Sequence, residues 1–571
     1  MTRGRLKLVA LCIVGLVGAG IGAWLAGEAA IKARVSEAVF RATGRALVLV
    51  GPLSIRPGLS LSIVADDVSF ANAPDGSRPE MARARRVAAR VAWLPLFSRE
   101  IVVERLTLVE PSVLLETNAE GVPNWRFPPP RSPGAGIGAG VPATPWNVDA
   151  RMVELREGSV EWRDGRTHQG AKTLVPRLIL EAASAASPVS LSGEVQWGGA
   201  RAGVTGQFGS AASFRSATAA SPWPVRVVAE SAMERISVAG GIARPASFAG
   251  LIAVTAPQGD VSGDIAWRFA GRPMLEANLS SKRLDLDAVR AILAARPAPP
   301  PAGPVGQSAD PVHAPPDPEL PFAALNRMDG DVRLAVSELR LAGVTLVGFV
   351  GHAVLREGKL ALDPVGGQGA GGRLDMTASV DASVAEPPVT VSLRGDGIAV
   401  KPVLAAFGWP GDVLANANVS VDLRGQGRTI HALAAGLDGH VALAIADGEV
   451  DNNVFSAALG GFMRAARLPA EFGAGRTSIR CLAVRLDAAH GLVAATTMLL
   501  DTRRLTLQGM GEVDLASERV ALRLRPLVRI GGTLREPKVT LDSGGLLGAL
   551  MAGERRVADP CPPALANARL P

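Results

Sequence analysis

The segment Arg503–Leu527, RRLTLQGMGEVDLASERVALRLRPL, alternates apolar and polar residues on both sides of a short polar turn. Because successive side chains of a strand point to opposite faces, this alternation predicts a β-hairpin with one apolar face. That face must cover a packed core, a partner or an apolar ligand, and the alternation alone leaves the three open. The residues expected on it are Leu505, Leu507, Val520, Leu522 and Leu524.

The same alternation recurs about every dozen residues between turns rich in Gly, Asp, Asn and Pro, which is typical of an antiparallel all-β protein. Aromatic residues make up 4% of the chain, and Tyr is absent. A closed core of this size would usually use more aromatic bulk, whereas an open apolar trough would not need it. Further candidates for a lining of that kind are Leu59, Leu61, Ile63, Val189, Leu191, Val195, Val332, Leu334, Val336, Val441, Leu443 and Ile445.

The first residues predict a membrane anchor. The segment Leu8–Ala26, which includes Trp24, carries no charge and is long enough to span a hydrocarbon core of about 30 Å. Arg3, Arg5 and Lys7 precede it, which favours a cytoplasmic N-terminus. A cleaved signal peptide is the alternative, but its apolar region is usually only about 7–15 residues long. We therefore expect an uncleaved anchor.

Beyond the anchor the chain contains two cysteines, Cys481 and Cys561. A disulfide between them would attach the C-terminal tail to the last sheet in an oxidising compartment. Two unrelated free thiols are the alternative, and the sequence leaves both open.

The sequence offers no chemistry for an enzyme. The six His are scattered and fall in no metal-ligand spacing, and neither a phosphate-binding loop nor a nucleophile elbow is present. We therefore predict no catalytic residues, no metal and no cofactor. The net charge of +7 comes mainly from Arg scattered near acids, which argues against a nucleic-acid partner.

Pro- and Gly-rich stretches divide the chain. A short amphipathic helix ended by Gly44 should follow the anchor. Short helices should also follow strands within Leu279–Leu293 and Leu393–Phe407, which share one layout. The tail should begin as a short helix and end in disorder-prone residues. The expected parts are a cytoplasmic tip and anchor (1–27), an N-terminal β domain (28–295) with a flexible insertion (128–145), a linker (296–321), a C-terminal β domain (322–545) and the tail (546–571).

Three regions resemble the AsmA family. Thr43–Pro74 has the family's Thr-Gly-Arg, a Gly-bearing hairpin and an Asn-Ala-Pro loop, and Trp93–Trp125 has a Leu-Pro-Leu, the strand IVVERL and a closing Asn-Trp. At the other end, Cys481, Leu499–Pro526 and Ile530–Asp542 are similar to the family's C-terminal region. These motifs lie at both ends of the chain in the family's order.

The resemblance implies a fold and a function. AsmA-like proteins are anchored in the bacterial inner membrane by a single pass, with most of the chain in the periplasm. The implied fold is mainly β: an N-terminal transmembrane helix, then long curled antiparallel β-sheets that form an open U-shaped groove, with a few short helices. The implied partners are phospholipids moving between inner and outer membranes, and a periplasmic or outer-membrane protein at the C-terminal end. The alternative is a scaffold or regulator of outer-membrane protein assembly that transfers no lipid.

Overall fold

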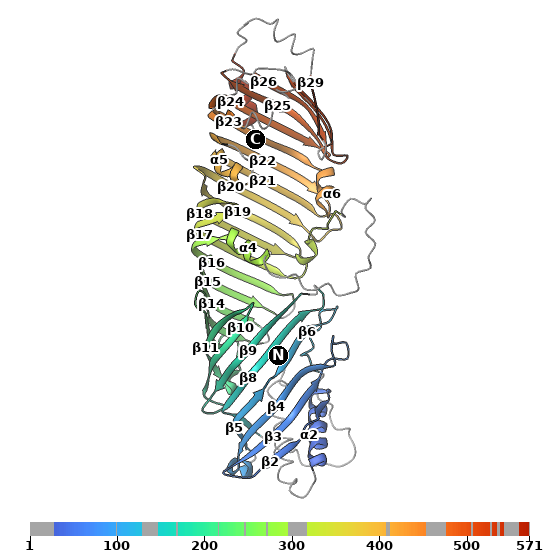
Figure 1. Ribbon diagram of the computed structural model, residues 1–571, viewed down its shortest axis with the longest axis vertical. Coiled ribbons are helices and arrows are strands. Elements are labelled where there is room, and N and C mark those ends of the chain that lie inside the picture. The colour runs from blue at the N-terminus through green and yellow to red at the C-terminus, as the bar shows by residue number, and fades with distance from the viewer. Residues whose placement is uncertain are drawn as a thin grey trace. The chain divides into compact units, whose positions relative to one another are not determined.

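The protein is mainly β with a few short helices, as predicted (Figure 1). Its residues divide into two compact units. The first unit contains Met1–Pro257 and Pro297–Ala302, and the second contains Gln258–Arg296 and Gly303–Pro571. The computed structural model describes residues 28–98, 100–127, 147–166, 169–214, 216–244, 247–269, 272–294, 317–406, 412–452, 475–503, 506–525, 528–533, 537–541 and 559–569.

The first unit is a mixed sheet preceded by the helix α2 (Glu28–Thr43). The helix ends where predicted, because Gly44 adopts a φ of 70° that a glycine reaches without strain. The other elements are β1 (Leu47–Leu49), β2 (Leu53–Arg56), β3 (Ser60–Ala71), β4 (Glu80–Ala92), η1 (Leu94–Ser98), β5 (Glu100–Val109), β6 (Ser112–Thr117), β7 (Asn147–Ala150), β8 (Met152–Asp164), β9 (Gly170–Glu181), β10 (Pro188–Trp197), β11 (Ala200–Ser210), α3 (Ala211–Phe214), β12 (Trp223–Glu230), β13 (Arg235–Ala243) and β14 (Ser247–Ala256).

The sheet of the first unit is not wholly antiparallel, so that part of the prediction was wrong. β5 pairs in parallel with β7 and β8, and β6 pairs in parallel with β8. Parallel strands need a longer connection than a hairpin turn, and residues 118–146 between β6 and β7 are long enough to provide it. From β8 to β14 the described pairs are antiparallel neighbours in chain order.

The second unit repeats this arrangement with one parallel pair, β16–β17. β15 pairs with β16 in the antiparallel direction, and β16 pairs with β17 in the parallel direction, so the three strands are neighbours in one sheet. The second unit begins at Gln258, which precedes the predicted linker in the sequence. The elements are β15 (Gly259–Arg268), β16 (Met274–Asp285), α4 (Leu286–Ala294), η2 (Phe322–Ala324), β17 (Asp329–Leu341), β18 (Val344–Arg356), β19 (Lys359–Gly369), β20 (Gly372–Asp381), β21 (Pro388–Ala399), α5 (Val400–Ala406), β22 (Val413–Gln426), α6 (Ile430–Ala435), β23 (Asp438–Asp451), β24 (Arg476–Ala489), β25 (Leu492–Thr502), β26 (Thr506–Asp514), β27 (Arg519–Arg525), β28 (Val528–Gly532), β29 (Pro537–Leu541) and α9 (Cys561–Arg569).

Closed apolar cores occur where a helix lies on a sheet. Ile31 and Val35 of α2 pack in one core with Leu61 and Ile63 of β3. The helices predicted after β16 and β21 are α4 and α5, and each contributes to a smaller core beside its strand. The sequence therefore located these helices correctly, together with the strands that precede them.

The C-terminal helix α9 corrects the prediction of a disorder-prone end. Cys561 forms a disulfide with Cys481 of β24. Of the two alternatives left open by the sequence, a disulfide or two free thiols, the structure therefore contains the disulfide. Arg480 joins the same region through 2.8 Å ion pairs to Asp501 and Asp559. Ala568 packs against alanines of β23 and β24. Residues with small side chains can form a helix here because the sheet and the disulfide hold it.

The predicted anchor, Leu8–Ala26, lies outside the described residues. Within the described part of the chain, no helix combines the length and the apolar character needed to cross a bilayer.

Removing the disulfide should destabilise the last strands. The bond joins residues 80 positions apart, and closing a loop of that length stabilises a fold by about 4–5 kcal/mol in the chain-entropy account. We expect Cys481→Ser to lower the free energy of unfolding of the second unit by an amount of this order, measured by denaturant titration with and without reductant. A Cys12→Ser control should leave that unit unchanged. Equal stability of the oxidised and reduced forms would contradict this expectation.

A buried acid on β7 should make stability depend on pH. Asp149 is buried, its Oδ1 has no hydrogen-bond partner among the described residues, and burial raises its pKa. A raised pKa in the folded state means that the ionised carboxylate destabilises the fold at pH values above that pKa. We expect Asp149→Asn to raise the free energy of unfolding at pH 7 by about 1 kcal/mol. The gain should shrink as the pH falls through the folded-state pKa, measured by unfolding at several pH values.

The matched control for Asp149 is Glu154, which is also buried but accepts hydrogen bonds from two arginines. Arg156 at 3.0 Å and Arg177 at 3.2 Å hold the pKa of the Glu154 carboxyl below its ordinary value. Its stabilisation is present above the unfolded-state pKa and is lost as the pH falls through the lower folded-state pKa. Glu154→Gln should therefore destabilise the protein at pH 7, the opposite sign to Asp149→Asn. A change of the same sign in the free energy of unfolding of both variants would contradict the different roles given to Asp149 and Glu154.

Candidate functional site

The registers of the first unit align apolar residues in one continuous row across ten strands. Residues directly opposite each other in paired strands carry their side chains on the same face. With about 4.8 Å between strands, the row is roughly 40 Å long. This first apolar row consists of Ile63, Ala89, Leu106, Val153, Leu180, Leu191, Gly206, Val227, Val238 and Ile252.

The first apolar row is closed at one end and open along the rest. Ile63 and Ala89 are buried in the core to which α2 contributes. From Leu106 onward every member of the row is half-exposed. The neighbouring positions on these strands, such as Ser190 and Ser192 of β10, are exposed and polar. Most of the row is therefore an apolar surface that the described chain does not cover.

A second, longer row crosses all fifteen strands that the structure describes in the second unit. Every member whose exposure the structure describes is half-exposed, and the row is roughly 65 Å long at the usual strand spacing. This second apolar row consists of Gly263, Leu279, Leu334, Gly351, Val365, Met376, Leu393, Val421, Val441, Leu486, Ala495, Gly511, Leu522, Ile530 and Val539.

The opposite face of the second sheet is largely polar. One row there runs through β20 to β24 as Thr377, Ser392, Asp422, His440 and Asp487. The helix α9 also lies on this side, because the alanines it contacts, Ala444 and Ala483, alternate along their strands with members of the apolar face. α9 and its disulfide therefore leave the second apolar row uncovered.

The structure places the predicted lining residues in several environments. Leu59 corrects the prediction, because β3 begins at Ser60 and Leu59 lies in the preceding turn with its side chain exposed. Leu505 lies outside the described residues. The buried residues are Leu61, Ile63, Val336, Ile445 and Val520. The half-exposed residues are Val189, Leu191, Val195, Val332, Leu334, Val441, Leu443, Leu507, Leu522 and Leu524.

For Leu61 and Ile63 the expected open lining was also wrong. They lie in the closed core with Ile31 and Val35, because the amphipathic helix α2 buries its apolar side against this end of the sheet. Val336 is likewise inside the small core to which Leu286, the first residue of α4, contributes. The helices thus close parts of a face that alternation alone could not show to be closed.

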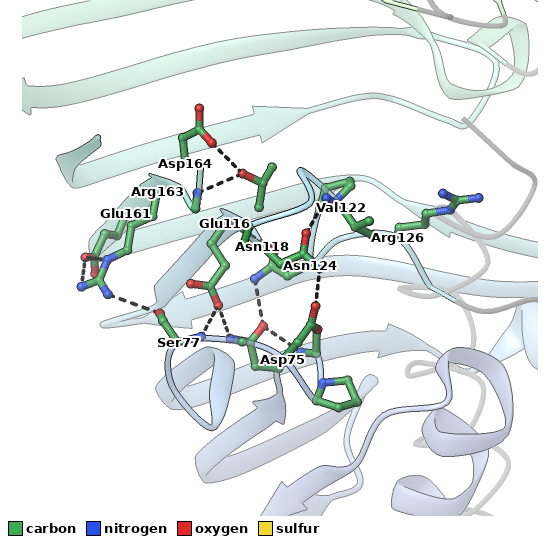
Figure 2. A pocket seen from close by; sticks show the side chains of 18 of the residues that line it. Asp75, Ser77, Glu116, Asn118, Val122, Asn124, Arg126, Glu161, Arg163 and Asp164 are labelled. Carbon is green, nitrogen blue, oxygen red and sulfur yellow. Dashed lines mark hydrogen bonds and ion pairs between the residues drawn. The ribbon is translucent and has the colours of Figure 1, made fainter. Parts of the chain in front are cut away.

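A pocket of about 1200 Å³ lies where the ends of β3, β6 and β8 meet the end of α2 (Figure 2). Three buried side chains are bonded to one another in its wall. Asn72 Nδ2 donates to Glu116 Oε1 at 2.7 Å, and Asn124 Nδ2 donates to Asn72 Oδ1 at 2.9 Å. The backbone N–H of Ser77 donates to the same Glu116 oxygen at 2.9 Å. Buried polar groups are stable when paired in this way.

The loop that contains Asn72 fits this network closely. A Cβ at Gly76 would overlap the Asn72 amide and lie 2.9 Å from Glu116 Oε1, so the loop needs glycine at this position. Arg45, just beyond α2, is buried with its guanidinium 4.7 Å from the centre of the Phe127 ring. Burial lowers the pKa of Arg45, and the nearby Asp75 opposes that shift.

The hydrogen bonds among Asn72, Glu116 and Asn124 in the pocket wall therefore connect separate loops, and we call this network the joint. Its buried carboxylate already accepts two hydrogen bonds, and the acids at its rim are bonded to neighbours such as Asn118, which donates to Asp75 at 2.6 Å. Sequence reasoning used Asn72 and Asn124 only as family markers and did not predict that they meet. Glu116, on a strand between them, carried no signal of its own.

One group of residues in the described chain has the composition of a metal site, namely Cys481, Asp501 and Cys561. The two sulfur atoms are bonded to each other, and Asp501 is paired with Arg480. These residues therefore form the attachment of α9.

A family model described as "AsmA family" matches residues 6–181 and 248–498. These matched segments cover well over half of the 571 residues. The chain belongs to the AsmA family. Membership of this family points to a role in outer-membrane and lipid homeostasis, and its members are not known enzymes.

Among curated proteins, the chain is similar to "AsmA family protein YhjG" of Escherichia coli (strain K12). The identity is 22% over 257 residues, which are 42% of this chain and 37% of that protein. The chain thus matches little more than a third of the length of this relative. No solved structure matches the chain.

The joint in this AsmA-family chain should depend strongly on Asn124. Its side chain makes three hydrogen bonds, to Asn72, to the carbonyl of Leu114 and from the N–H of Glu116. Because all three are buried, Asn124→Ala should lower the free energy of unfolding of the first unit by about 2–4 kcal/mol. Asn118→Ala, which removes exposed hydrogen bonds in the same pocket, should cost less than about 1 kcal/mol. Equal losses in thermal unfolding would show that the buried network adds nothing.

Proposed function

We propose that this protein binds the acyl chains of phospholipids along its two apolar rows and supports phospholipid transport between the inner and outer membranes, without catalysing a reaction. The observation that carries the proposal is the half-exposed state of the rows. A soluble monomer rarely exposes continuous apolar surface of this length unless the surface binds something. Family membership, with its link to lipid homeostasis, supports the same direction.

The chemistry of the rows suits an acyl chain. Their members are Val, Leu, Ile, Met, Ala and Gly, which offer dispersion contacts and no polar atom that a lipid tail would leave unpaired. Each methylene removed from water contributes about 0.8 kcal/mol. Because neighbouring positions in a row resemble each other, a tail held at one strand would have a similar free energy at the next. That uniformity favours movement along the rows over capture at one point.

The proposed location is the periplasmic side of the bacterial inner membrane, with residues 1–27 as cytoplasmic tip and anchor. The apolar segment Leu8–Ala26 with its preceding basic residues supports the anchor. The Cys481–Cys561 disulfide supports an oxidising compartment, because such bonds persist there. The proposed partners are phospholipids and the inner membrane, together with a periplasmic or outer-membrane protein at the C-terminal end.

Photo-crosslinking tests the lipid proposal with matched positions on one strand. Leu393 belongs to the second apolar row, and Ser392 beside it belongs to the polar row on the opposite face. We expect a photo-reactive residue at Leu393 in the full chain, in living cells, to give a covalent phospholipid adduct, while one at Ser392 gives none. Mass spectrometry of the purified protein distinguishes the two.

Val421 and Asp422 on β22 repeat the comparison independently. Both apolar positions are half-exposed, so the substitution should leave folding intact, which thermal unfolding checks. Protein adducts without lipid at Leu393 and Val421 would favour a scaffold of outer-membrane assembly over lipid transport. Equal lipid labelling on both faces would also overturn the proposal, because it would show contact with a membrane and no selective binding.

A further inference from the structure

An exposed apolar cluster lies in two loops of the first unit, and none of its residues belongs to the first apolar row. Leu59 precedes β3, and Leu94 and Phe97 belong to η1 between β4 and β5. These residues are 104%, 82% and 86% exposed, the highest values among the large apolar residues of the described chain. We call these three residues the apolar tip. Clustered exposed apolar side chains mark an interaction surface more often than single ones do.

The apolar tip is held in place by the fold. The start of β3 pairs with the end of β4 through Ser60 and Ala92, so the two loops lie at the same end of neighbouring strands. Trp93 Nε1 donates to the carbonyl oxygen of Gly58 at 3.0 Å and ties one loop to the other. Leu96, within η1, is buried in the core of the first unit. The contacts of Trp93 and Leu96 therefore hold the two loops in place with the three apolar residues exposed.

A row of arginines lies beside the tip. Arg56 and Arg90 both pair with Ser62, and Arg90 pairs with Arg105, so the three guanidinium groups share the polar face of β2, β4 and β5. All three side chains are exposed, and none makes an ion pair within the described chain. Glu104, the acid beside this row, accepts a hydrogen bond from Ser60 at 2.7 Å. Like charges placed opposite each other destabilise a sheet, so an anionic ligand would relieve them.

The chain itself indicates which anionic surface is near. Leu53, at the start of β2, donates its N–H to the Glu28 carboxylate at 2.8 Å. From Leu53 to Leu59 the backbone reaches at most about 20 Å. Glu28 directly follows the segment that contains the apolar stretch Leu8–Ala26. The apolar tip is therefore close to the point where the proposed anchor joins the first unit.

We infer that the apolar tip inserts into the interfacial layer of the bilayer that holds the anchor, and that Arg56, Arg90 and Arg105 bind the phosphate groups of its anionic lipids. Apolar side chains backed by basic ones are the combination that binds membrane surfaces. This inference rests on the proposed function for its anchor. It adds a second contact that fixes the orientation of the first unit against the membrane.

Depth-dependent quenching tests the inference in the full chain. A nitrobenzoxadiazole label is attached at Phe97→Cys in a Cys12→Ser background, and the protein is reconstituted into vesicles of phosphatidylethanolamine and phosphatidylglycerol. We expect blue-shifted emission and strong quenching by lipids with a nitroxide near the headgroup. A label at Met233→Cys, an exposed position elsewhere in the first unit, should show neither effect.

The charges are tested by changing the vesicles and the arginines separately. Quenching at position 97 should weaken in phosphatidylcholine vesicles and at high salt, because exposed charges are screened. The variant Arg56→Gln, Arg90→Gln, Arg105→Gln should lose this dependence on lipid charge. Quenching at position 97 that never depends on lipid charge, in the original chain, would overturn the role of the arginines.

Flotation separates this inference from the proposed function. A chain that floats with the vesicles but is not quenched at position 97 would overturn the apolar tip and leave lipid binding along the rows intact. A chain that does not float would overturn the anchor, and with it this inference. Lipid adducts at Leu393 report on the rows alone and are unaffected by either result.

Discussion

The rest of the structure depends on cross-strand register. Because side chains alternate along a strand, a slip of one residue would move every Leu and Val of that strand to the opposite face. The backbone hydrogen bonds that align Leu393 with Val421, and Val421 with Val441, therefore also keep the apolar face continuous. Bulges do not interrupt the apolar face, because Val365 still lies in the second apolar row despite the register shifts within β19. The helices cover this face only in places, and the proposed binding of lipid requires the rest of the face to stay uncovered.

Alternation in the sequence predicted the strands, their facing residues and the helices after β16 and β21, because these are local properties. It could not predict which positions a helix covers: Leu61 and Leu334 have the same pattern, yet the first is buried in the core beside α2 and the second is half-exposed. Nor could it predict the parallel pairs, since their partners are separated by long connections. The joint of Asn72, Glu116 and Asn124 was missed for the same reason, because its members meet only through the topology.

Two kinds of stability coexist in the first unit. The joint and the core around Val35 are closed and satisfied, and they hold the strand ends and α2 in fixed positions. Beyond Leu106 the sheet keeps its hydrogen bonds but leaves its apolar face half-exposed. A fold of this type is stabilised by backbone pairing and local cores, so most of its apolar face can remain partly exposed.

The simple make-up of the apolar rows has a consequence for sequence divergence. The family model leaves residues 182–247 unmatched, yet the first apolar row passes through that segment at Leu191, Gly206, Val227 and Val238 without a polar residue. A row of this kind requires only that each position be apolar and in register, and many residue combinations meet that requirement. Chains can therefore diverge to low sequence identity and still present the same apolar surface.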